Sequence, residues 1–153
     1  MRRTFHRVWI LFCLYTVWCL ASEAVFTGVA DVIRNYWAGN PFNSNLPCRT
    51  SLWSIPVYGI SAAIAFGIVG AWKPGFFKWA WWKRGLVYVV GTYCFEFTWG
   101  WILESLTGTC PWLYRNSSFA VWRYIKPEYF GLWFMFGFSL EWIKVKILPR
   151  MLD

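Results

Sequence analysis

The chain has 153 residues, of which 58% are hydrophobic, 24% are aromatic and only 14% are charged. Soluble domains carry about a quarter charged residues, so this composition excludes an ordinary soluble domain and indicates a membrane protein small enough for one bundle. The net charge of +8 does not indicate nucleic-acid binding, because the basic residues cluster between apolar stretches as topology signals and lipid head-group contacts.

Four stretches are apolar enough to cross a bilayer core, which takes roughly 20 residues. They cover about residues 8–29, 52–72, 85–106 and 129–147. The sequence therefore predicts an all-α integral membrane protein, a four-transmembrane-helix bundle in which residues 1–153 form a single domain. A cleaved signal peptide is the alternative for the first stretch, which begins with Met1-Arg2-Arg3 and is apolar to Leu20. The apolar character continues to Val29, which favours a span.

The first stretch carries a polar stripe. Its members recur every four residues and lie on successive turns of one helix face: Cys19, Glu23, Thr27 and Asp31. A carboxylate in hydrocarbon is costly unless it is protonated, hydrogen-bonded or matched by a cation. We therefore expect this stripe to face another span rather than lipid.

The second stretch carries small residues at the same interval, namely Gly59, Ala63, Gly67 and Ala71. Small residues at this spacing form a groove against which another helix packs closely. The groove would serve helix packing inside the bundle; a face for a second protein is the alternative.

An aromatic and basic segment, Lys73 to Arg84, separates the second stretch from the third. It alternates Trp and Phe with Lys, which is typical of a short interfacial segment in the head-group layer. Generic anchoring is the simpler interpretation, and binding of a specific anionic lipid is the alternative.

The third and fourth stretches repeat the four-residue interval. On the third stretch the members are Thr92, Glu96, Gly100 and Glu104. On the fourth they are Gly137 and Glu141. Successive members lie about 40° apart around a helix, so each set makes one slanted stripe. Four of the seven acidic residues thus form a candidate intramembrane polar site: Glu23, Glu96, Glu104 and Glu141.

Glu96 is the acid on which a function would most readily depend, because nothing in its own helix can neutralise it. Glu141, in contrast, is followed one turn later by Lys144. In a structural interpretation, Glu96 is a protonated carboxyl bonded to Tyr, Trp or Thr across the helices. In a functional one, it binds a proton, a metal ion or an amine-bearing ligand. Either way, it should be buried against the first or fourth span.

Basic residues predict the orientation. Ten lie at the N-terminus, between the second and third stretches and at the C-terminal end, and five lie in the other two connections. Both termini are therefore predicted to be cytoplasmic, with residues 30–50 and 107–128 outside or in a lumen. Cys48 and Cys110 share that side, where an oxidising compartment would allow a disulfide. Asn116-Ser117-Ser118 is an N-glycosylation sequon on the same side.

Several blocks along the chain resemble one family. They are Ser22–Thr27 (SEAVFT), Thr50–Gly59 (TSLWSIPVYG), Tyr93–Gly100 (YCFEFTWG), Cys110–Tyr114 (CPWLY), Pro127–Tyr129 (PEY) and Glu141. In this order, over about residues 15–150, they are similar to the transmembrane protein 229 family, which shares a domain with bacterial proteins described as CmpB-like ABC-transporter permeases. The resemblance implies a four-span membrane protein without an established catalytic residue, with Glu23 and Glu96 on motif positions. Leu113 departs from the family's acid, and Cys48 has no obvious counterpart.

An enzyme is not expected, because the only histidine, His6, lies at the predicted cytoplasmic end, and the chain has neither a Gly-x-x-x-x-Gly-Lys-Ser/Thr loop nor a Gly-x-Ser-x-Gly elbow. No cofactor or metal is expected either. The small size, the groove and the Trp-rich exterior favour an accessory or assembly subunit of a larger membrane protein complex, surrounded by membrane lipids. The alternative is an oligomeric carrier or channel for a small cation, a proton or a lipid that uses Glu96 and Glu23.

Overall fold

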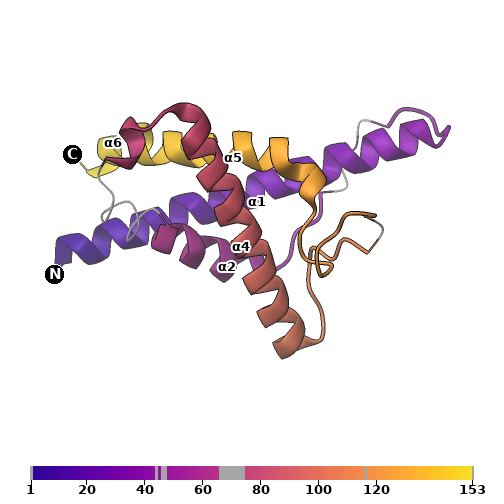
Figure 1. The fold of residues 1–153 in the computed structure, drawn as a ribbon, viewed down its shortest axis with the longest axis horizontal. Helices are drawn as coiled ribbons and strands as arrows, with labels where there is room; N and C mark the ends of the chain where they lie inside the picture. The colour runs from indigo at the N-terminus through magenta and orange to yellow at the C-terminus, as the bar shows by residue number, and fades with distance from the viewer. Residues whose placement is uncertain (1, 44, 46–47, 66–74, 116, 153) are drawn as a thin grey trace. The chain divides into compact units, whose positions relative to one another are not determined.

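The computed structural model describes residues 2–43, 45, 48–65, 75–115 and 117–152. The regular elements in these ranges are helices (Figure 1), and the β-type pairing found there is one isolated bridge between Val121 and Ile125. The all-α prediction is therefore confirmed for the described part of the chain. The chain divides into two compact units, Met1–Ala63 and Ile64–Asp153, and each is described by itself.

The first unit consists of a long helix with a short one packed against it (Figure 1). α1 runs over Arg2–Trp37 and α2 over Ser54–Ala62. With 36 residues, α1 is about 54 Å long at a rise of 1.5 Å per residue. It continues past the predicted end at Val29, because the polar residues that follow are accommodated on the helix surface, where Arg34 pairs with Asp31 at 2.9 Å. The loop that follows α1 therefore begins only after Trp37.

Gly59 allows α1 and α2 to approach each other closely. A Cβ atom at this position would lie 2.3 Å from the Phe12 ring and 2.5 Å from Thr16 Oγ1, both on α1. This end of the predicted small-residue groove is therefore filled by the chain itself, as the packing interpretation requires. Ala63 is half-buried, while Gly67 and Ala71 lie outside the described residues.

The second unit is built on α4, Trp81–Thr107, and on a helical segment that runs from Phe130 to Leu152. A 3-10 turn, η2 (Phe76–Lys78), precedes α4. Gly108 ends α4 with a φ of 74°, the left-handed conformation that glycine favours at the C-terminal end of a helix. The later segment consists of η3 (Pro127–Tyr129), α5 (Phe130–Trp142), the π-helical η4 (Ile143–Ile147) and α6 (Leu148–Leu152).

Two glycines bring α4 and α5 together where these helices cross (Figure 1). A Cβ atom at Gly137 of α5 would lie 2.3 Å from Cβ of Tyr88, and one at Gly85 of α4 would lie 2.1 Å from the Phe134 ring. Around these contacts, the Tyr88 and Phe138 rings meet edge to face at 5.6 Å. The crossing is thus an aromatic core in which the glycines give the rings room.

By length and composition, two of the predicted spans are helices that could cross a membrane, over Phe5–Trp37 and Trp81–Thr107. A signal sequence near the N-terminus would meet the same criteria as the first of them. The second predicted span begins as a shorter apolar helix, Ser54–Ala65, and its remainder lies outside the described residues. The fourth predicted span is helical from Phe130 onward.

Candidate intramembrane polar site

Each of the four predicted site carboxylates lies beside a tyrosine side chain of its own unit. The pairs are Glu23 with Tyr58, Glu96 with Tyr114, Glu104 with Tyr124, and Glu141 with Tyr88. A phenol can donate a hydrogen bond to a carboxyl group in either protonation state, so these contacts reduce the cost of placing the acids in an apolar environment. Glu23 belongs to the first unit and the other three acids belong to the second, and each acid has its own set of partners.

In the first unit, Glu23 is bound by the segment that leads into α2. Thr50 Oγ1 donates a hydrogen bond of 2.7 Å to Glu23 Oε2. One turn further along α1, Thr27 Oγ1 exchanges hydrogen bonds with the backbone of Arg49, both at 3.1 Å, and Arg49 Nη2 lies 3.7 Å from Asp31 Oδ2. The polar stripe of α1 therefore contacts the segment that precedes α2, whereas the sequence predicted that it would face another span.

Glu141 is bound by two side chains of α4. Its Oε2 accepts hydrogen bonds from Arg84 Nε at 2.9 Å and from the Tyr88 hydroxyl at 2.5 Å. Arg84 Nη1 also donates to the carbonyls of Phe77 and Trp79, so one guanidinium links η2, α4 and α5. The local explanation through Lys144 was therefore incomplete, because partners 57 and 53 residues away hold this carboxylate.

Glu104 is bound by Arg123 and Tyr124, which belong to a loop with two positive φ angles. Arg123 Nη2 lies 3.1 Å from Oε1 and 3.3 Å from Oε2, and the Tyr124 hydroxyl donates to Oε2. This last bond raises the pKa of Tyr124, since it stabilises the protonated phenol. Trp122 and Arg123 have φ values of 52° and 70°, which large side chains rarely adopt, so the bonds to Glu104 help to hold a costly conformation.

Glu96 is the most buried of the four acids, with 4% of its surface exposed. The Tyr114 hydroxyl donates a hydrogen bond of 2.8 Å to Oε1, and Trp112 Nε1 donates one of 3.2 Å to the Glu96 carbonyl. These partners come from the loop after α4, which the sequence analysis did not connect with Glu96. The expected burial is present, and the contacts come from that loop as well as from the predicted fourth span.

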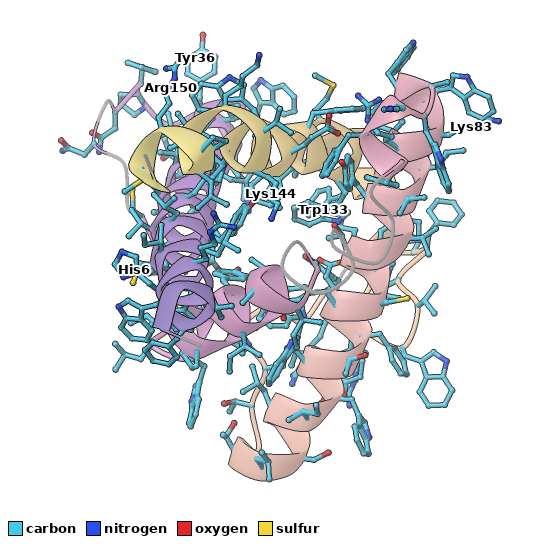
Figure 2. The ribbon with its side chains drawn as sticks, turned by 90° about the vertical axis from the view of Figure 1, so that its left-hand side faces the viewer. His6, Tyr36, Lys83, Trp133, Lys144 and Arg150 are labelled. Atoms are coloured by element: carbon cyan, nitrogen blue, oxygen red, sulfur yellow. The ribbon has the colours of Figure 1, made fainter. Side chains whose placement is uncertain are left out.

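The second carboxylate oxygen of Glu96 is buried without a hydrogen-bond partner, as is the indole nitrogen of Trp133 on α5. Trp133 is labelled in Figure 2. The ring of Tyr129 stands edge-on to both Tyr114 and Trp133, at 5.7 and 5.9 Å. No lysine or arginine forms an ion pair with Glu96 in the described part of the chain. Glu96 therefore lies among aromatic side chains with one hydrogen bond to its carboxyl group and without an ion pair to any described residue.

The five cysteines are free in the structure. Cys48 and Cys110 belong to different units, so the predicted bridge between them stays a prediction. Cys48 is an exposed residue of the first unit, and Cys110 is a buried residue of the second, where burial raises the pKa of its thiol. Asn116, the predicted glycosylation site, lies outside the described residues. Among those described, no group of three or more His, Cys, Asp and Glu side chains could hold a metal ion.

The tyrosines were missed by the sequence analysis, although half of the eight in the chain lie beside one of the four acids. The sequence gives one usable signal: Tyr88 and Glu141 both lie in apolar stretches, where a phenol and a carboxylate each need a polar partner. Which tyrosine meets which acid depends on helix pairing and on the path of the loop.

No protein-family model matches the chain, and no solved structure matches it either. The contacts of the four carboxylates are therefore the basis on which a function is proposed.

Proposed function

We propose that this chain is a four-span membrane protein that acts as an accessory or assembly subunit of a larger membrane protein complex. α1 and α4 would supply two spans, and the apolar helix Ser54–Ala65 and the segment from Phe130 onward would begin or supply the other two. The resemblance to the transmembrane protein 229 family supports this arrangement. Both termini would be cytoplasmic, and if the cell is eukaryotic the membrane would be the endoplasmic reticulum or the plasma membrane.

The observation that supports an accessory role most directly is that the acids are engaged inside the chain. A carrier or channel needs polar groups that reach a water-filled path and exchange partners. Glu104 and Glu141 each accept hydrogen bonds from an arginine and a tyrosine side chain, and Glu23 interacts with Thr50 and Tyr58. Such fixed contacts are what helix seams in a membrane require.

The outer surfaces of the two long helices also fit an accessory role. In the most apolar window of both α1 and α4, only 22% of the residues are buried inside the structure. Large side chains such as Trp101 and Trp9 are exposed there. Within its own unit, each helix leaves this surface open to other contacts, and aromatic residues are those most enriched where membrane and protein partners make contact.

Co-purification tests this proposal. The tagged full chain would be expressed in its native membranes, extracted in mild detergent and analysed by quantitative mass spectrometry. We expect one other integral membrane protein to be enriched in near-stoichiometric amount. A Trp101→Ala variant should reduce that enrichment without changing the melting temperature, because the side chain is exposed. A monodisperse chain that purifies alone would contradict the accessory role.

A carrier for protons or small cations is the second candidate, and Glu96 is the observation that favours it. Its buried second oxygen has no hydrogen-bond partner, and no described cation balances its charge. Reconstituted vesicles would distinguish the two functions. A carrier should support ion or proton flux that Glu96→Gln abolishes, whereas an accessory subunit should support no flux alone.

A further inference from the structure

The turn that precedes α4 contains a small hollow. It has a volume of about 220 Å³ and is lined by Trp79, Ala80 and Lys83. Lys83 projects outward from the start of α4 (Figure 2), and its Nζ lies 5.3 Å from the centre of the Trp82 ring. The hollow therefore combines an accessible ammonium group with an indole wall.

The charge on this surface is not compensated. Residues 75–83 contain Lys78 and Lys83 and no acidic residue. Neither lysine forms an ion pair with any described residue. The adjacent Arg84 differs from them, because its guanidinium is already paired with Glu141. Two lysines therefore leave a net positive surface that fits an anionic partner.

The walls of the hollow are held in place before any ligand arrives. The Phe76 ring packs against Trp79 at 5.4 Å and against Tyr88 of α4 at 5.6 Å. Arg84 also donates hydrogen bonds to the carbonyls of Phe77 and Trp79. A site built in advance loses less conformational entropy on binding.

We propose that this hollow binds the phosphate head group of an anionic phospholipid in the cytoplasmic leaflet. It lies at the start of a helix of membrane-crossing length, so it would lie at the membrane surface. The exposed indoles of Trp79, Trp81 and Trp82 suit the head-group layer, and a lysine ammonium binds phosphate as a point charge. The inference goes beyond the proposed function, because it holds for an accessory subunit and for a carrier alike.

Native mass spectrometry of the full chain in detergent tests the inference, with phosphatidylglycerol and phosphatidylcholine of matched chain length as probes. We expect one phosphatidylglycerol to be retained in preference to phosphatidylcholine. Lys83→Gln should reduce this preference about fivefold, the size of one lysine contact with an anionic lipid. Lys83→Arg, which keeps the charge, should retain most of it.

Lys146→Gln is the matched control, because Lys146 is an exposed lysine on the same predicted side of the membrane but outside the hollow. It should leave the preference unchanged. An equal loss in Lys83→Gln and Lys146→Gln would show generic surface charge only and would overturn the site. Absence of any preference in the wild type, or its persistence in Lys83→Gln, would overturn it as well. Complete displacement by inorganic phosphate would indicate a soluble phosphate ligand and would overturn the assignment to a lipid.

Discussion

Arg84 and Glu141 form an ion pair with 2.9 Å between Nε and Oε2, which links the start of α4 to the end of α5. Both side chains are about 15% exposed, and Tyr88 donates to the same carboxylate oxygen. Each charge would be costly so far from water without the other. The crossing of α4 and α5 is therefore fixed by a polar clamp next to its glycine contacts.

The clamp predicts coupled losses of stability. Arg84→Gln and Glu141→Gln should each lower the free energy of unfolding by about 1–3 kcal/mol, because a partly buried charge is left unpaired. The double variant should lose less free energy of unfolding than the sum of the two single losses, since the second change removes the charge that the first left unpaired. Unfolding of the detergent-solubilised chain would measure this cycle, with the exposed neighbour Lys83→Gln as control. Strictly additive losses would show that the two residues are not coupled.

Gly137 predicts a steric effect at the same crossing. In Gly137→Ala the new methyl group would lie 2.3 Å from Cβ of Tyr88, an atom that cannot move without its backbone. We expect a loss of about 1–3 kcal/mol and a lower melting temperature. Gly91→Ala in α4 is the control, because its methyl group would meet nothing within 4 Å and should leave stability unchanged or raise it by up to ~1 kcal/mol. Equal melting temperatures for the two variants would contradict the close approach.

Glu128 predicts a pH-dependent contribution to stability. Ser117 Oγ donates a hydrogen bond of 2.6 Å to its Oε1, and this bond lowers the pKa of Glu128. A carboxyl whose pKa is lowered on folding contributes stability above its unfolded pKa of about 4.3, and this contribution is lost as the pH falls through the folded value. Ser117→Ala should therefore be less stable than the wild type at neutral pH, and the difference should shrink in acid.

Unfolding midpoints across a pH series would test this, on protein made in bacteria so that the sequon is unmodified. The exposed neighbour Ser118→Ala is the control and should follow the wild type at every pH. A difference between wild type and Ser117→Ala that does not change with pH would show that the hydrogen bond does not act through the ionisation of Glu128.

The sequence predicted the helices better than it predicted their partners. α4 spans Trp81–Thr107 where its apolar pattern predicted about 85–106, because a long apolar run determines a helix locally. The burial of Glu96 was also predictable, because an acid without a local cation is not stable in lipid. Its partner Tyr114 was not, since it lies 18 residues away on a loop whose path no periodicity describes.

The same limit explains why the sequence did not predict the main partner of Glu141. The Arg84–Glu141 pair depends on which helices cross, whereas Lys144 was chosen because it is near in sequence. The predicted disulfide rests only on a shared side of the membrane, and it stays a prediction because Cys48 and Cys110 belong to different units. The spacing of residues along the chain thus predicts the helices, whereas the packing of distant segments determines which side chains meet.

The asymmetry of basic residues predicts the topology. With ten on one side and five on the other, both termini should lie in the cytoplasm. Single cysteines placed at either end of a cysteine-free variant should resist a membrane-impermeant thiol reagent in intact cells and should react after permeabilisation. Labelling of either terminus from the outside would contradict the four-span arrangement, and loss of the N-terminal segment on maturation would identify α1 as a signal peptide.

Glu96 predicts a specific pattern of coupling with Tyr114. Glu96→Leu should lower the free energy of unfolding by about 1–3 kcal/mol, because it leaves the Tyr114 hydroxyl without its acceptor in a buried seam. Adding Tyr114→Phe should recover part of this loss, since the hydroxyl group whose acceptor was removed is then absent as well. Glu96→Gln keeps an acceptor oxygen for Tyr114, so its loss should be smaller. Thr98→Val, an exposed position on the same helix, is the control and should change little.

The same variants separate the two proposed functions. If Glu96 is a structural carboxyl, Glu96→Gln should retain the partner protein, and Glu96→Leu should lose it only to the extent that it unfolds. If Glu96 carries a proton or cation, Glu96→Gln should melt like the wild type and yet abolish flux in vesicles, because the amide cannot exchange a proton or balance a cation. Additive effects of Glu96→Leu and Tyr114→Phe on stability would show that their hydrogen bond does not hold the seam.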